Sequence, residues 1–219
     1  MLKYPCLVLD HDDTVVRSES TVNYPAFLEA LRVLRPGETI SLREYTLWCF
    51  RHGFSALCTQ RFGFTEAEFQ VQFQIWLEYV MTHIPPCFPG IDRILRRQRE
   101  AGGLICVVSH SARENILRDY DTHFGLRPDC IYGWELGPER RKPMPYSLDQ
   151  IMAAYSLSPE ELLMVDDLKP GYDMAESRGV DFAWAGWARE DIPEISQFMQ
   201  QACAYVFRST QELEHFLFT

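Results

Sequence analysis

The chain has 219 residues, and its 31 Asp and Glu outnumber its 21 Lys and Arg, which gives a formal charge of −10 at pH 7. Hydrophobic residues make up 47% and charged residues 24% of the chain, a composition typical of folded globular proteins. The length suits one domain, or one domain with a sizeable insertion. An acidic surface repels nucleic acids and anionic membranes, so neither is an expected partner. It also repels small phosphorylated molecules unless a local feature reverses the field.

The first residues contain one Lys and only a short apolar run before Asp10. This run is too short for a signal peptide or a membrane span, and we expect the protein to be cytoplasmic. The cysteines number seven, are widely spaced and form no CxxC pair, so neither a disulfide framework nor a zinc site is indicated. Cys6 and Cys106 lie in apolar runs and are expected to be small buried side chains.

Short apolar runs recur along the chain, each bounded by turn residues. Their hydrophobicity is continuous rather than alternating, which predicts strands buried on both faces of a parallel sheet. The runs are Cys6–Leu9, Leu104–Val108, Cys130–Tyr132, Leu162–Val165 and Phe182–Ala185.

Helical patterns lie between these runs. Residues 91–101 repeat apolar side chains at helical spacing between a Pro-Gly start and a Gly-Gly stop. Ser111 is expected to cap a helix that runs to about Phe124, and Ser158 with Glu161 forms a capping box before the fourth run. Strand followed by helix, repeated, predicts an α/β fold with a doubly wound, Rossmann-like parallel sheet.

Residues 16–88 interrupt this alternation because they contain no convincing strand. Apolar side chains recur there at helical spacing, and we interpret them as a helical core rather than a ligand-binding box. They are Phe27, Leu31 and Leu34, then Phe69, Phe73, Trp76, Leu77 and Val80. We therefore predict an α/β core domain of residues 1–15 and 89–219, with a helical domain of residues 16–88 inserted after the first strand.

Polar residues follow the apolar runs directly, and in open α/β sheets ligands bind at the carboxyl ends of the strands. The candidates are Asp10, His11, Asp12, Asp13 and Thr14 after the first run, Ser109 and His110 after the second, Lys142 before the fourth, and Asp166 and Asp167 after it. Converging carboxylates repel one another, and a hard cation such as Mg²⁺ relieves that repulsion.

Asp10 and Asp12 are two residues apart, so both side chains point the same way along an extended chain. One carboxylate can then attack as a nucleophile while the other acts as general acid and base. A Ser hydroxyl and a Lys ammonium aimed at the same point would stabilise a transferring phosphoryl group.

These residues resemble the haloacid dehalogenase superfamily of phosphatases and phosphotransferases, and within it the phosphoglycolate phosphatase and β-phosphoglucomutase-like subfamily. The resemblance covers most of the chain and is carried by motifs in the family's order. They are Leu-Val-Leu-Asp10-His-Asp12-Asp-Thr14, Val-Val-Ser109, Lys142-Pro143 and Met-Val-Asp166-Asp167.

The resemblance implies a role for each matching residue. Asp10 would be the nucleophile that forms an aspartyl-phosphate, and Asp12 would protonate the leaving group and then activate water. Ser109 and Lys142 would hold the phosphoryl oxygens, and the backbone amides of the adjacent His11 and His110 are expected to face the same group. The helical insertion resembles the family's cap, a lid that excludes water and selects substrates.

The resemblance also implies a Mg²⁺ site made of Asp10, the Asp12 backbone carbonyl and Asp167. Asp166 would lie outside the direct ligands, although the roles of Asp166 and Asp167 can also be reversed. Asp13 departs from the family, which more often has Gly at this position. It adds negative charge and restricts the backbone conformations that Gly would allow.

The sequence thus favours a Mg²⁺-dependent phosphatase that acts on a small phosphorylated metabolite. Mg²⁺ and Lys142 would make the electrostatic potential at the site positive. The net charge of the chain therefore argues only against an anionic substrate that binds without metal. A sugar-phosphate mutase with the same nucleophile is the nearest alternative. A receiver-like regulatory protein that stores a phosphoryl group without turnover is the alternative from another class. No oligomeric state is indicated.

Overall fold

The computed structural model describes residues 2–189 and 191–219. The chain divides into two compact units. The first, which we call the sheet unit, contains the residues up to Val16 and those from Cys87 on. The second, which we call the helical unit, is Arg17–Pro86. Each unit is described by itself below.

The sheet unit contains a six-stranded sheet in the order β3-β2-β1-β4-β5-β6, and every neighbouring pair of strands is parallel. This is the doubly wound α/β fold that the sequence predicts. Strand order reverses between β1 and β4, which makes their carboxyl ends the expected ligand site. The strands are β1 Cys6–Leu9, β2 Leu104–Val108, β3 Cys130–Tyr132, β4 Leu162–Asp166, β5 Asp181–Ala185 and β6 Tyr205–Phe207.

The central strands are buried on both faces, as their continuous apolar sequences predict. Cys6 and Cys106 are both buried and free of any disulfide, as expected. Strands β4 and β5 are each one residue longer than predicted. Strand β6 was not predicted; it lies at the sheet edge, where Tyr205 and Val206 are only half-buried.

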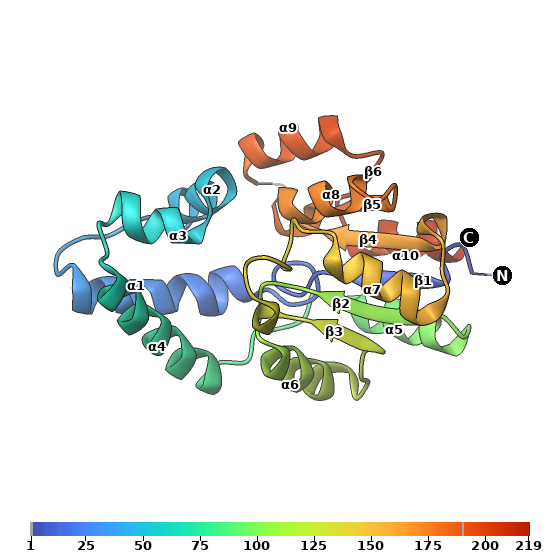
Figure 1. Ribbon diagram of the computed structural model, residues 1–219, viewed down its shortest axis with the longest axis horizontal. Coiled ribbons are helices and arrows are strands. Elements are labelled where there is room, and N and C mark those ends of the chain that lie inside the picture. The colour runs from blue at the N-terminus through green and yellow to red at the C-terminus, as the bar shows by residue number, and fades with distance from the viewer. Residues whose placement is uncertain (1, 190) are drawn as a thin grey trace. The chain divides into compact units, whose positions relative to one another are not determined.

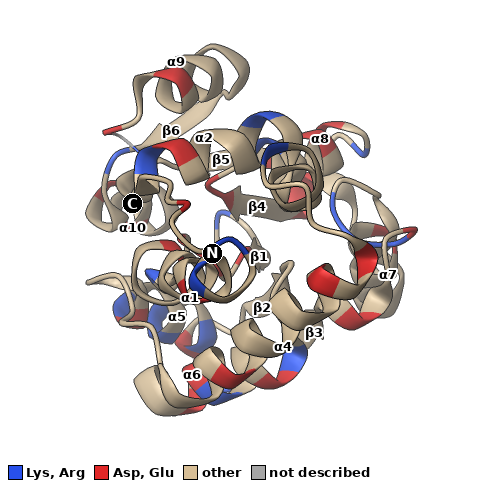
Figure 2. Ribbon diagram, turned by 90° about the vertical axis from the view of Figure 1, so that its left-hand side faces the viewer, with Lys and Arg blue, Asp and Glu red and all other residues tan. Residues whose placement is uncertain are grey.

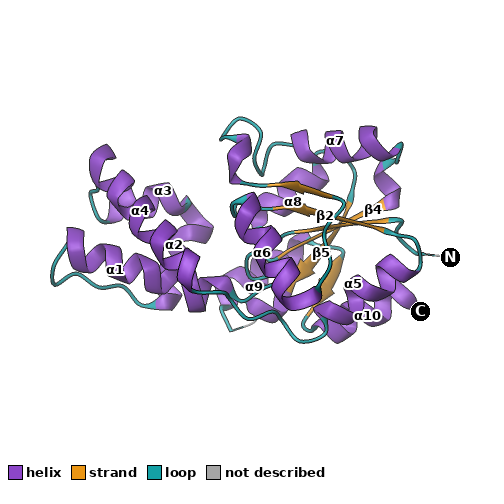
Figure 3. Cartoon of the chain, turned by 90° about the horizontal axis from the view of Figure 1, so that it is seen from below, coloured by secondary structure: helices purple, strands orange, loops and turns teal. Residues whose placement is uncertain are grey.

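Helices cover both faces of the sheet: α7 and α8 lie on one side, and α5 and α10 on the other (Figure 3). Apolar side chains of α5, α6 and α10 form one core cluster with alternate residues of the strands. The helices of this unit are α5 Ile91–Glu100, α6 Arg113–Phe124, α7 Tyr146–Tyr155, α8 Lys169–Glu176, α9 Pro193–Ala202 and α10 Thr210–Phe218.

Two expected helix caps have different outcomes. The capping box of Ser158 and Glu161 is confirmed, and it begins a single 3₁₀ turn that leads into β4. The prediction for Ser111 is wrong, because α6 begins after Ala112. The backbone N–H of Ser111 instead donates to the hydroxyl of Ser109, so this stretch forms a turn before the helix starts.

The helical unit contains α1 Tyr24–Leu34, α2 Leu42–His52, α3 Phe54–Ala56 and α4 Glu66–Thr82 (Figure 1). Phe27 is fully buried at its centre and packs against the rings of Tyr45, Phe54 and Phe62. The prediction for α4 is right about the helix but wrong about its burial. Val80 is buried, whereas Phe73, Trp76 and Leu77 are only half-buried. The core lies instead among α1, α2 and the loop before α4.

Charged residues of both signs are mixed along the outer helices, and Figure 2 shows acidic and basic positions side by side on α6. Some of them form surface ion pairs, such as Arg127 with Asp121 and Arg99 with Asp129. In the described part of the chain, no helix is both long and apolar enough to cross a membrane.

Candidate active site

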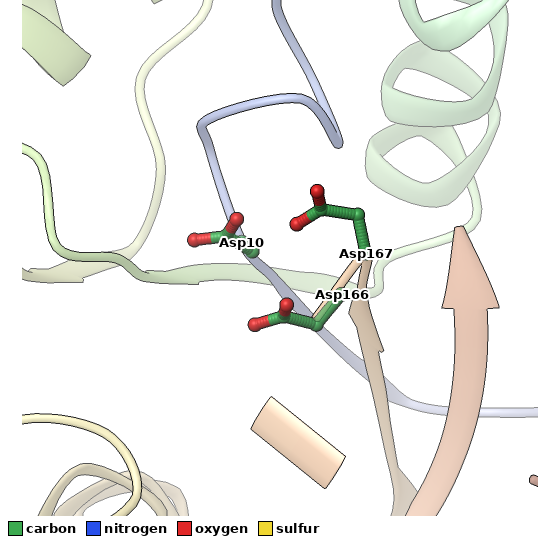
Figure 4. Close-up of side chains that lie close together, drawn as sticks. All are labelled: Asp10, Asp166 and Asp167. Carbon is green, nitrogen blue, oxygen red and sulfur yellow. The ribbon is translucent and has the colours of Figure 1, made fainter. Parts of the chain in front are cut away.

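Three buried carboxylates lie together where β1 and β4 end. Strand β1 pairs with β4 so that Leu9 lies beside Val165, which brings the next residues, Asp10 and Asp166, to the same edge. Asp10, Asp166 and Asp167 each offer an oxygen atom, and these atoms all lie within 4.8 Å of one another. Figure 4 shows the carboxylates of Asp10 and Asp166 turned to the same side, with that of Asp167 facing Asp10.

Lys142 joins two of these carboxylates. It lies in the loop between β3 and α7, and its Nζ donates to Asp10 Oδ1 at 2.7 Å and to Asp166 Oδ2 at 2.5 Å. Burial by itself would lower the pKa of Lys142, but the two negative charges outweigh this effect and raise the pKa. The ammonium group therefore stays charged in an almost dry site.

Asp166 is held on both of its oxygen atoms. Besides the bond from Lys142, its Oδ1 accepts the backbone N–H of Leu168 at 2.8 Å. Gly171 in α8 leaves space for this carboxylate, because a Cβ at that position would lie 2.3 Å from Asp166 Oδ2. Burial raises the pKa of Asp166, and the charge of Lys142 only partly opposes the rise.

Asp167 has a different partner. Arg189, which follows β5 after one 3₁₀ turn, donates from Nε to Asp167 Oδ2 at 2.7 Å and from Nη2 to Asp13 Oδ2 at 2.8 Å. Burial raises the pKa of Asp167 well above its usual value, although Arg189 opposes this effect. The sequence analysis did not identify Arg189. The one feature of the sequence that could have indicated such a residue is the acidic Asp13, because a carboxylate buried at this position requires a cationic partner.

The residues after β1 form a tight turn. The His11 carbonyl accepts the N–H groups of Val15 and Val16, and the Asp13 N–H donates to the Val16 carbonyl. Asp13 has φ = 55°, in the left-handed region that favours glycine. Asp13 therefore adopts the conformation that Gly would take, despite the restriction expected for a residue with a Cβ. Asp12 is half-buried, and its carboxylate accepts no hydrogen bond from the described residues.

The rings of His11 and His110 lie in different surroundings. The ring of His11 is buried, lies 3.0 Å from Asp119 of α6 through Nε2 and stacks on Tyr120. The ring of His110 hydrogen-bonds the Lys142 carbonyl at 3.0 Å. Burial and the nearby Lys142 lower the pKa of His110, so its ring is neutral at pH 7.

Ser109 is buried at the end of β2, the strand next to β1. Its backbone N–H donates to the Tyr132 carbonyl of β3, and its hydroxyl accepts the N–H of Ser111 at 3.2 Å. The hydroxyl proton can therefore still be donated to an anion. The fold thus places Ser109 at the same edge of the sheet as Asp10.

The buried charges suit one divalent cation. Lys142 bridges Asp10 and Asp166, and Arg189 bridges Asp13 and Asp167. When all four carboxylates are ionised, these two cations leave the network two positive charges short. Oxygen donors on carboxylates are the ligands that hard divalent cations prefer. Asp10, Asp166 and Asp167 therefore fit a site for a hard divalent cation both in chemistry and in charge.

The chain is similar to known proteins. The family model described as haloacid dehalogenase-like hydrolase matches residues 8–185, a range that includes Asp10, Lys142 and Asp167. None of the curated proteins matches the chain by sequence.

Solved structures share the fold. A haloacid dehalogenase-like protein from Bacteroides fragilis has a TM-score of 0.79 and 20% identity, with 96% of this chain and 100% of that chain covered. A predicted phosphoglycolate phosphatase from Haemophilus somnus has a TM-score of 0.77 and 18% identity over 99% of both chains. CbbY from Rhodobacter sphaeroides, solved with xylulose-(1,5)bisphosphate, has a TM-score of 0.72 and 16% identity over 97% of this chain and 96% of that chain.

Proposed function

Because the chain belongs to the haloacid dehalogenase-like hydrolase family, we propose that it is a Mg²⁺-dependent phosphatase that hydrolyses a small phosphorylated metabolite through an aspartyl-phosphate on Asp10. One observation carries the proposal. Lys142 bridges Asp10 and Asp166 at the end of β1, beside a third carboxylate, so that a nucleophile, a cation and a metal-binding set meet at one point.

Asp10 is suited to be the nucleophile. Lys142 engages its Oδ1, while Oδ2 accepts no hydrogen bond from the described residues. In the first step the free oxygen forms a bond to phosphorus as the bond to the leaving oxygen breaks. Lys142 and the hydroxyl of Ser109 then stabilise the charge on the phosphoryl oxygens.

Asp12 is suited to move protons in both steps. Its carboxylate is half-buried and not engaged by the described residues, so it is free to approach a bound substrate. Asp12 gives its proton to the leaving alcohol and later takes one from the attacking water. Water attack on phosphorus breaks the bond to Asp10, releases phosphate and returns Asp10 to its carboxylate form.

The cation would be held by Asp10, the Asp12 backbone carbonyl and Asp167. Asp166 already uses both oxygens for Lys142 and Leu168, whereas one oxygen of Asp167 accepts no bond from the described residues. This difference supports Asp167 as the direct ligand and Asp166 as a residue that anchors Lys142. When bound, the cation supplies positive charge that draws in the phosphoryl group.

We propose the helical unit as a cap that selects the substrate. It is inserted directly after the turn that carries Asp12, and its described elements are all helical. Small phosphorylated acids and sugar phosphates are the substrates to test first. The similar structures include a predicted phosphoglycolate phosphatase and a protein solved with a sugar bisphosphate.

The test is hydrolysis of p-nitrophenyl phosphate by the full chain, with and without Mg²⁺. We expect multiple turnovers that require Mg²⁺ and a loss of at least about 10³-fold in Asp10→Asn, because the nucleophile is removed. Asp121→Asn is the matched control, since it makes the same change in a surface residue paired with Arg127. Full activity in Asp10→Asn would contradict the mechanism, and a single turnover per chain would indicate phosphoryl storage instead.

A further inference from the structure

Arg189 and Asp13 form a buried ion pair that the proposed reaction does not use directly. The side chains of Arg189, Asp13 and Asp167 are 6%, 4% and 2% exposed. Arg189 contacts the two carboxylates through different nitrogen atoms, Nη2 for Asp13 and Nε for Asp167. The planar guanidinium therefore fixes the two carboxylates relative to each other, which a single ammonium point charge cannot do.

Asp13 has a backbone conformation that would suit glycine better. Its φ of 55° lies in the left-handed region, which costs backbone energy for any residue with a Cβ, although Asp tolerates it better than most. The turn itself therefore does not require an acidic side chain. The contact of Asp13 with Arg189 gives a reason for a carboxylate at this position.

The contact with Arg189 leaves Asp167 with one engaged oxygen and one open oxygen. Arg189 binds Oδ2, and the backbone carbonyl of Asp167 accepts the indole N–H of Trp184 at 3.0 Å. Side chain and backbone are thus both held. Oδ1 accepts no bond from the described residues, and the carboxylate of Asp167 faces Asp10 (Figure 4).

Asp13 also sets the charge that Asp167 presents. A buried Arg189 paired with Asp167 alone would cancel the negative charge that attracts a cation. Because Asp13 shares Arg189, Arg189 and the two carboxylates together carry a net charge of −1 when both carboxylates are ionised. Orientation and charge are therefore both provided by residues that do not themselves bind the cation.

We propose that Arg189 and Asp13 are positioning residues that orient the Asp167 carboxylate and preserve its charge for a divalent cation. This inference rests on the proposed function, because it assumes that Asp10 and Asp167 bind that cation. Partners that hold a metal ligand in place typically change metal affinity by about 10- to 100-fold when they are altered.

The test measures Mg²⁺ binding to the full chain by calorimetry without substrate, and the Mg²⁺ dependence of p-nitrophenyl phosphate hydrolysis. Arg189→Lys keeps the charge but loses the planar fork, and Asp13→Gly suits the left-handed backbone. We expect each variant to bind Mg²⁺ about 10-fold more weakly, with kcat largely recovered at saturating Mg²⁺ and KM for the ester unchanged. Arg178→Lys is the matched control, because Arg178 forms a bidentate pair with Asp149 at the surface.

The outcomes separate the two proposals. If the unaltered chain binds Mg²⁺ and both variants bind it equally well, the positioning role is wrong while the proposed function stands. If the variants lose thermal stability without any change in Mg²⁺ affinity, the pair is only structural and the inference is again overturned. If the unaltered chain binds no Mg²⁺ and hydrolyses no ester, both proposals fail. Asp13→Gly keeps the test informative should Arg189→Lys fail to fold.

Discussion

The two units of the chain use charged side chains in opposite ways. In the sheet unit, Lys142 and its partners Asp10 and Asp166 are each no more than 6% exposed. In the helical unit, Arg35 bonds Glu68 with side chains that are 25% and 29% exposed. Arg35 also donates to the carbonyls of Phe62 and Gly63, so it connects the end of α1 to the loop before α4.

This difference indicates where charge serves chemistry and where it serves structure. Removing charges from water is expensive, and buried ion pairs often stabilise a fold less than apolar side chains of similar size would. A buried network with more carboxylates than cations is therefore poorly explained by stability alone. In the helical unit, stability comes from the aromatic core around Phe27, and the exposed Arg35 bonds add a surface connection.

The largest expected effect comes from removing the buried cation with Lys142→Met. The change leaves the buried carboxylates of Asp10 and Asp166 facing each other without a cation between them, which costs about 3–5 kcal/mol of stability. It also removes a positive charge from the phosphoryl site, so kcat/KM is expected to fall by about 10²- to 10³-fold. Thermal unfolding and steady-state hydrolysis measure the two effects separately.

Lys169→Met is the matched control for Lys142→Met. Lys169 forms an exposed pair with Asp173 one turn along α8, and such pairs typically contribute less than about 1 kcal/mol. Both activity and stability should stay close to those of the unaltered chain. Equal effects of the two substitutions would show that burial does not distinguish the two lysines.

The next effect concerns the helical unit and its apolar core. Phe27→Ala removes a fully buried ring that contacts Tyr45, Phe54 and Phe62, and we expect a loss of about 3–5 kcal/mol in the free energy of unfolding. Denaturant unfolding followed by tryptophan fluorescence measures it. Phe198→Ala in α9, where the residue is 37% exposed, is the control with a small expected effect. A loss below about 1 kcal/mol for Phe27→Ala would show that this core does not hold the unit together.

The sequence predicted the strands of the sheet from their continuous apolar runs. The continuous apolar runs of β1 and β2 gave the bounds of these strands correctly. Both faces of such a strand pack against other elements, so its apolar residues follow one another without interruption and mark where the strand begins and ends. Strand β6 was missed: it lies at the edge of the sheet, and Tyr205 and Val206 are partly exposed there. In α4 the aromatic spacing predicted the helix correctly, but spacing does not tell how deeply Phe73 and Trp76 are buried.

The candidate site was predicted in part for a related reason. Asp10 directly follows β1 and Asp166 ends the adjacent strand β4, so parallel pairing of these strands brings the two residues together. Lys142 was a candidate from its place before the fourth apolar run, and the family resemblance gave it a role, but no local pattern reveals the path of the loop that brings it to Asp10. Arg189 had neither signal: it follows a strand two positions from β1 and reaches Asp13 only through tertiary packing.

The smallest expected effect is the pH dependence of the partly exposed pair of Arg35 and Glu68 in the helical unit. The bond from Arg35, together with the Thr65 backbone N–H, lowers the pKa of Glu68 to about 2, compared with about 4.3 in an unfolded chain. A carboxyl whose pKa is lowered by folding stabilises the folded state above the unfolded value, and this contribution is lost as the pH falls toward the folded value. Glu68 should therefore contribute fully above about pH 5 and progressively less down to pH 2.

Glu68→Gln isolates this contribution, because Gln keeps the shape of the side chain but does not titrate. The difference in melting temperature between the two chains should be largest near pH 6 and should shrink as the pH falls, since every other carboxyl titrates in both. Glu78→Gln is the control, because Glu78 is an exposed residue of α4 whose carboxylate bonds only the amide of Gln74 among the described residues. A difference that stays constant with pH would mean that Arg35 holds Glu68 by shape rather than by charge. The exposed pair would then differ from the buried pairs of the sheet unit in the kind of interaction as well as in its strength.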